Sequence, residues 1–273
     1  MSVENLFSNV YNLPSIPKVV QELVASFNSN TANADEIASK ISKDQAFAAK
    51  VLRLGNSARY GVGRKIASIN AAVVLLGVDA LRTLVVASGV TSAFVEVPGM
   101  DKRQFWKDTF TVASIAKMLA KHARVDKEVA FTCGMLHSIG ELLIHMGESD
   151  IAVRIDAQVT KGANRVQLQQ NQLGYDFTEV GEELARRWKF PEEIQDAIRN
   201  QVEPLGEPFS PYAALIALAV YINESEKAGK SREEQLAAFP NELAQRLQLD
   251  LLKVFESWDQ LKDEEDDIDA LLG

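Results

Sequence analysis

Histidine and cysteine are scarce in this chain of 273 residues, which contains three histidines and one cysteine. The histidines are His122, His137 and His145. Because imidazole and thiolate are the usual ligands of zinc and related metals, few residues are available for a histidine-rich metal centre. The single Cys133 cannot form a disulfide within the chain, which is consistent with a reducing compartment.

The sequence also lacks an excess of basic residues, a secretory leader and a long apolar run. Its net charge is −9, with 38 Asp and Glu against 29 Lys and Arg, which argues against a dominant surface for nucleic acid. The longest run of apolar and aromatic residues, 212–222, is well below the roughly 20 residues that cross a bilayer as a helix. We therefore expect a cytoplasmic protein that has protein partners and does not insert into membranes.

Strand-like alternation and solenoid-length repeats are missing too, whereas apolar residues recur at helical spacing along most of the chain. Ser68 suits a helix N-cap, Gly77 a break in the helix that follows, and Pro98-Gly99 a turn. Asn33 resembles the start of a capping box. Further helices are expected from Phe105 to Leu119, through Val129 to Ile144, and at 150–160, 163–172, 177–189, 192–202, 210–228 and 241–262. The pattern predicts an all-α, compact multi-helix fold.

The closest match to a phosphate-binding loop is the stretch Gly61-Val62-Gly63-Arg64-Lys65. Glycine-rich turns can direct backbone amides at an anion. Arg53, Arg59, Arg64 and Lys65 would add cationic groups. The stretch therefore predicts a possible anion loop for a nucleotide or other small-molecule ligand, with a solvated connector as the alternative.

Several short motifs occur in a recognisable order along the first three quarters of the chain. They include Leu13-Pro14-Ser15-Ile16-Pro17, Leu136-His137-Ser138-Ile139-Gly140 and Trp188-Lys189-Phe190-Pro191. As an ordered set they resemble the HDOD family, the HD-related output domain. The resemblance implies an HD-like helical domain over residues 8–205. Beyond it, the chain's own helical patterning predicts a helical extension at 206–262 packed on that domain, and its composition an acidic tail at 263–273.

The HDOD family is similar to the HD phosphohydrolases, whose metal ligands are histidines and aspartates. The resemblance places Asp108 where active relatives carry the first His, and Ser138 where they carry the Asp of the His-Asp pair, so that His137 alone is kept. Phe177, Gln201 and Val202 stand at later His positions.

These replacements bear on activity, because Phe and Val cannot bind a metal and an unactivated water does not attack a phosphoryl group. The resemblance thus implies a protein that is not an enzyme and has no cofactor. Its pocket would be vestigial. A degenerate metal site built from Asp108, His137 and Glu141 stays open as an alternative, since carboxylates and imidazole can bind a divalent ion.

HDOD proteins are regarded as outputs of bacterial signal transduction, so the resemblance implies a regulatory role through contacts with signalling proteins. Residues 266–273 resemble the acidic peptide by which the flagellar switch protein docks a chemotaxis response regulator. In a helix, Ile268, Leu271 and Leu272 would share a face, and Asp267 and Asp269 could meet a basic rim.

We hypothesise that this tail docks on a receiver domain. A frayed terminus, or a helix folded back on its own domain, is the alternative reading of the same residues. Two other classes of protein also stay open: a residual metal-dependent phosphohydrolase, and a sensor of a nucleotide or other small molecule without turnover.

Overall fold

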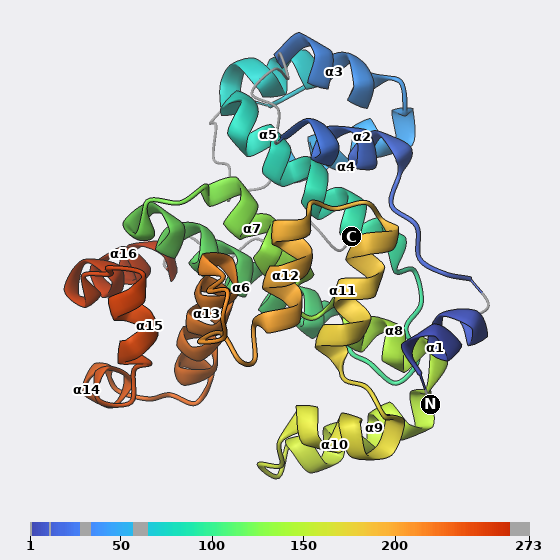
Figure 1. Ribbon diagram of the computed structural model, residues 1–273. Helices are drawn as coiled ribbons and strands as arrows, with labels where there is room; N and C mark the ends of the chain where they lie inside the picture. Colours follow the sequence, from blue (N-terminus) through green and yellow to red (C-terminus); the bar gives the residue numbers. More distant parts are fainter. Residues whose placement is uncertain (1, 11, 28–33, 57–64, 263–273) are drawn as a thin grey trace.

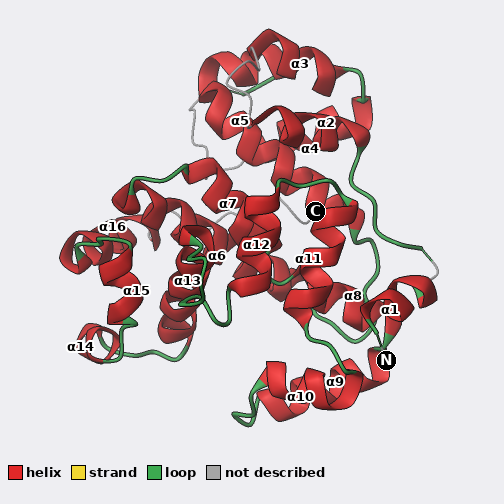
Figure 2. Cartoon of the chain, viewed as in Figure 1, coloured by secondary structure: helices red, strands yellow, loops and turns green. Residues whose placement is uncertain are grey.

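The chain is built from α-helices joined by short loops (Figure 2). The computed structural model describes residues 2–10, 12–27, 34–56 and 65–262, and no strand occurs among them. This confirms the all-α fold. Asn33 and its expected capping box lie outside the described residues.

Four helical segments form a lobe at one end of the molecule, which we call the N-terminal lobe (Figure 1). They are α2 (Lys18–Phe27), α3 (Ala34–Ser42), α4 (Gln45–Gly55) and the first part of α5 (Ile69–Ala93). The Ser68 hydroxyl accepts a hydrogen bond from the Ala71 amide at 3.1 Å and caps α5. Gly77 has a φ of 82° and interrupts the same helix, a conformation that glycine adopts without steric cost. Both predictions are confirmed.

The middle of the molecule contains α6 (Lys102–Ala123), α7 (Lys127–Leu136), α8 (Ile139–Gly147), α11 (Phe177–Arg187) and α12 (Glu192–Asn200). Two glycines allow close helix crossings around the turn between α7 and α8. A Cβ on Gly134 would lie 2.4 Å from the Ala113 Cα, and one on Gly140 would lie 2.0 Å from the Phe177 carbonyl oxygen. Glycine is therefore required at both positions, and the turn at 137–138 is held between α6 and α11.

Two helices project from this centre, and four more follow it in the chain. The projecting pair is α9 (Ser149–Val159) and α10 (Arg165–Leu173), and the final helices are α13 (Pro211–Lys227), α14 (Arg232–Ala237), α15 (Asn241–Arg246) and α16 (Leu251–Lys262) (Figure 1). Apolar residues of α13 and α16, such as Leu218 and Phe255, join Ile115 of α6 in a second buried cluster. His122 Nε2 also lies 3.0 Å from the Ser257 hydroxyl. The C-terminal helices are thus packed on α6.

Some helix boundaries differ from those expected. The single helix expected through Val129 to Ile144 is divided at residues 137–138 into α7 and α8, and Ser138 has φ −118° and ψ 12°. The helix expected at 241–262 is divided into α15 and α16, because Gln248 takes a left-handed φ of 54° just after α15. The short helices α1 (Val3–Asn9) and α14 were not predicted.

Among the described residues, two stretches have the length and hydropathy of a membrane span, Ile69–Ala93 and Lys127–Gly147. Their most apolar windows are 50% and 78% buried within the fold. Each stretch is also interrupted, the first at Gly77 and the second at residues 137–138. Much of their apolar surface is therefore used for packing between helices.

Candidate functional site

The vestigial pocket suggested by the sequence is centred on the turn between α7 and α8. His137 follows α7, Asp108 lies on α6, Phe177 begins α11 and Gln201 follows α12. The structure gives each of these residues a defined set of partners within the chain.

The His137 imidazole is oriented by the helix that precedes it. Its Nδ1 lies 2.6 Å from the Gly134 carbonyl oxygen, which can only accept, so Nδ1 carries the proton in this contact. Burial lowers the pKa of His137 to about 4, although the Gly134 carbonyl and the Asp108 carboxylate act in the opposite direction. The ring is therefore neutral near pH 7.

Gln201 is buried and bridges two helix ends. Its Nε2 donates to the His137 carbonyl oxygen at 2.7 Å and to the Ile198 carbonyl oxygen at 2.8 Å. An amide NH₂ group donates hydrogen bonds and offers no lone pair to a metal. Gln201 therefore ties the end of α12 to the turn between α7 and α8.

Asp108 has a cationic partner from the C-terminal helices. Its Oδ2 lies 2.9 Å from Lys227 Nζ of α13, and its Oδ1 accepts a hydrogen bond of 3.0 Å from Gln104 Nε2. Both side chains are partly exposed, so the energy of this pair is modest. Even so, the Lys227 ammonium already neutralises the carboxylate that would have to bind a metal ion.

Glu141 is directed away from this turn and toward α10. Its carboxylate accepts hydrogen bonds from Arg165 Nη1 at 3.0 Å and from Gln169 Nε2 at 3.1 and 3.0 Å. Burial raises the pKa of Glu141, against the opposing effects of Arg165 and Gln169.

The three residues of the suggested degenerate metal site are therefore committed to different partners. In the part of the chain that the structure describes, no group of three His, Cys, Asp or Glu residues is arranged to hold a metal ion. The side chains around the turn do not fit a metal centre, because the Gln201 amide donates to a carbonyl and the Lys227 ammonium pairs with Asp108, and neither donor group offers a lone pair to a metal.

The remaining residues of the suggested pocket are Ser138, Phe177 and Val202. The Ser138 hydroxyl makes no capping hydrogen bond at the start of α8, and Val202 is 43% exposed. Phe177 is partly buried, and its amide donates a hydrogen bond of 2.9 Å to Gln169 Oε1. Gln169 thus connects Glu141 to the N-terminus of α11.

A second polar network, which the sequence did not reveal, is centred on the fully buried His145. Its Nδ1 lies 3.1 Å from the Pro98 carbonyl oxygen and its Nε2 lies 3.0 Å from Asp156 Oδ2. Both partners only accept, so the arrangement favours the protonated imidazolium form of the ring. Burial by itself disfavours this charge, but Asp156 and the Pro98 carbonyl outweigh burial and the pKa of His145 is raised. Asp156 also pairs with Arg165 at 2.7 Å, which fixes α9 and α10 to α8.

The other residues singled out in the sequence are not brought to the pocket by any contact described. Arg53 and Lys65 are exposed near the ends of α4 and α5, while Arg59 and Arg64 lie outside the described residues. The acidic tail, including Asp267, Ile268, Asp269, Leu271 and Leu272, also lies outside them. The anion loop and the docking tail stay predictions.

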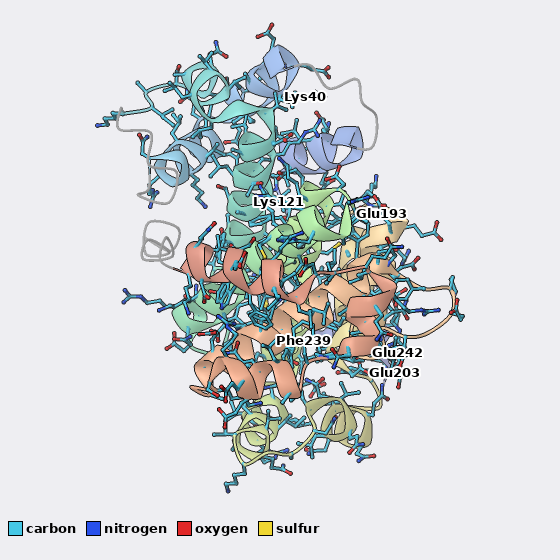
Figure 3. The ribbon with its side chains drawn as sticks, turned by 90° about the vertical axis from the view of Figure 1, so that its left-hand side faces the viewer. Lys40, Lys121, Glu193, Glu203, Phe239 and Glu242 are labelled. Atoms are coloured by element: carbon cyan, nitrogen blue, oxygen red, sulfur yellow. The ribbon has the colours of Figure 1, made fainter. Side chains whose placement is uncertain are left out.

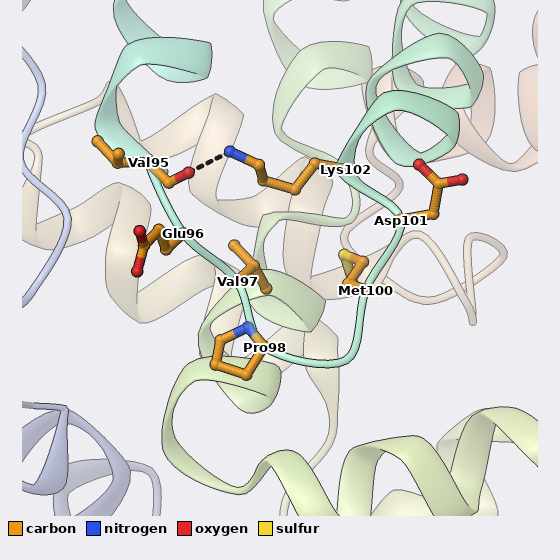
Figure 4. A pocket seen from close by; sticks show the side chains of 7 residues that line it. All are labelled: Val95, Glu96, Val97, Pro98, Met100, Asp101 and Lys102. Atoms are coloured by element: carbon orange, nitrogen blue, oxygen red, sulfur yellow. Dashed lines mark hydrogen bonds between the residues drawn. The ribbon is translucent and has the colours of Figure 1, made fainter.

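A separate cavity of about 420 Å³ lies along the connection between α5 and α6 (Figure 4). Its lining includes none of the candidate site residues that the sequence analysis named. Lys102 Nζ reaches across it and donates a hydrogen bond to the Val95 carbonyl oxygen. The cavity is lined by Val95, Glu96, Val97, Pro98, Met100, Asp101 and Lys102.

Known proteins resemble this chain over most of its length. A crystal structure from Shewanella amazonensis, described as a candidate phosphohydrolase, is 35% identical, with 98% of each chain covered and a TM-score of 0.84. A candidate signal-transduction protein from Marinobacter aquaeolei has the same fold at 23% identity, with a TM-score of 0.78 over 96% of this chain and 59% of its own.

An uncharacterized protein of Treponema pallidum is 23% identical over 220 residues, which are 79% of this chain and 43% of that protein. The chain thus spans less than half the length of this relative. The sequence model of the HDOD domain matches residues 13–204, which is more than half of the chain. The chain belongs to the HDOD family.

Proposed function

We propose that this HDOD protein is a non-catalytic regulatory protein that acts in signalling through contacts with other proteins. The observation that carries the proposal is the hydrogen bond of 2.7 Å from Gln201 to the His137 carbonyl oxygen. By its resemblance to the HD phosphohydrolases, Gln201 stands where an active relative carries a metal ligand, and the hydrogen bond of its amide supports a structural role instead. The pairing of Asp108 with Lys227 supports the same conclusion.

The finer part of the proposal is that the tail, residues 263–273, docks on a receiver domain. The tail has six acidic residues, together with Ile268, Leu271 and Leu272 at the spacing of one helix face. Peptides of this kind bind as helices whose apolar face enters a groove. The aspartates would meet basic residues at the rim of that groove.

Binding to purified receiver domains from the same genome tests this proposal. The full chain is compared with a chain that lacks residues 263–273, and with the triple variant Ile268→Ser, Leu271→Ser and Leu272→Ser. Leu252→Ser is the matched control, because Leu252 is an apolar residue of α16 that is 72% exposed. We expect binding by the full chain and the control only. Equal binding by the chain without its tail would contradict docking through the tail.

A further inference from the structure

Charge is distributed very unevenly between the N-terminal lobe and the rest of the chain. Residues 18–77, which span the N-terminal lobe, contain eight Lys and Arg against four Asp and Glu, a net charge of +4. The other residues contain 21 Lys and Arg against 34 Asp and Glu, a net charge of −13. A protein with a net charge of −9 therefore has one positively charged lobe.

Exposed basic residues and exposed apolar residues both occur on this lobe. Lys43, Lys50 and Lys65 are exposed around α4 and before α5. On the first part of α5, Ala72 is buried, whereas Val74 is 82% and Leu75 37% exposed. Apolar side chains with charged neighbours are the usual composition of a protein interface, with an apolar centre and a polar rim. Nucleic acid would use the charges but leave Val74 and Leu75 without a role.

The C-terminal tail has the complementary composition. Residues 263–273 contain six Asp and Glu, no Lys or Arg, and the three apolar residues Ile268, Leu271 and Leu272. The tail follows Lys262 at the end of α16. Helices α13–α16 lie beside α6 and α7, below the N-terminal lobe, in Figure 1 and in Figure 3, where Lys40 marks the lobe. An extended segment of this length reaches roughly 35–40 Å.

We propose that the acidic tail, residues 263–273, docks on the N-terminal lobe of its own chain, with its apolar residues against Val74 and Leu75 and its carboxylates near Lys43, Lys50 and Lys65. This contact goes beyond the proposed function and does not depend on it. If both interactions occur, a receiver domain has to compete with the lobe for the same segment.

Zero-length cross-linking of the full chain tests this contact, because a carbodiimide joins a carboxylate to an amine only when the two groups touch. We expect cross-links from the tail to Lys43, Lys50 and Lys65. The exposed Lys107, Lys161 and Lys189 are matched controls outside the lobe. Val74→Ser should reduce the lobe cross-links roughly tenfold, and high salt should reduce them too. Cross-links spread evenly over lobe and control lysines would overturn the proposal.

Mixing chains with light and heavy nitrogen separates this contact from one between copies. Cross-links that join only peptides with the same nitrogen isotope support docking in the same chain. Cross-links between light and heavy chains would show that a second copy is the occupant and would overturn the proposal. The cross-linking mixture contains no receiver domain. Failure of the tail to dock on the lobe is therefore distinct from failure of the tail to bind a receiver domain.

Discussion

Gln201 Nε2 donates a hydrogen bond of 2.7 Å to the carbonyl oxygen of His137, which connects the end of α12 to the turn between α7 and α8. Gln201 is 6% exposed, so little water is available to replace its amide. The bond thereby secures the turn between α7 and α8.

Gln201→Ala should destabilise the protein by about 1–3 kcal/mol, because it leaves the His137 carbonyl without its donor. Chemical denaturation measures this change. Gln167→Ala, at an exposed position on α10, is the control and should change the free energy of unfolding by less than about 0.5 kcal/mol. Equal stability of the two variants would mean that the Gln201 bond contributes nothing.

His137 should make the protein less stable as the medium becomes acidic. Its pKa is about 4 in the folded chain and about 6.5 when unfolded, so the unfolded state binds a proton first as the pH falls. Stability due to the neutral ring is present above pH 6.5 and is lost as the pH falls toward 4, by up to about 3 kcal/mol. His137→Asn should flatten this part of the stability profile, measured by denaturation at each pH.

His145, in contrast, should make the protein less stable as the pH rises. Its pKa is raised in the folded chain, so the folded state holds the proton more tightly than the unfolded state. The stabilisation is complete below about pH 6.5 and is lost as the pH rises through the folded pKa. Compared with His145→Gln, the unmodified chain should therefore lose stability on the alkaline side. A stability difference between the two chains that does not change with pH in this range would show that the pKa of His145 is not raised in the folded chain.

Helices α13–α16 should be needed for the preceding part of the chain, up to residue 205, to fold. Ile115 and Leu119 of α6 are fully buried in the cluster shared with α13 and α16. A chain ending at residue 205 exposes this face, and we expect it to aggregate or to bind a hydrophobic dye. A chain ending at residue 262 keeps the cluster and should still unfold in one cooperative transition. A cooperative unfolding transition in the shorter chain would contradict this expectation.

Local patterns allowed much of the fold to be predicted, since Ser68 and Gly77 act through their own backbone conformation. The division at residues 137–138 was missed because apolar residues continue through it and the close crossings at Gly134 and Gly140 involve distant segments. Around the turn between α7 and α8, the residues at the expected ligand positions could be named by resemblance. Their present partners could not, because Gln201 is 64 residues from His137 and Lys227 is 119 residues from Asp108.

The central claim is that the pocket no longer supports phosphohydrolase chemistry, and metal binding with turnover tests it most directly. The purified full chain is incubated with manganese, iron, magnesium or zinc, its bound metal is quantified, and it is assayed with phosphodiester and nucleotide substrates. We expect no stoichiometric metal and no turnover. Stoichiometric metal together with turnover that is abolished in His137→Ala would contradict the account and identify an active phosphohydrolase.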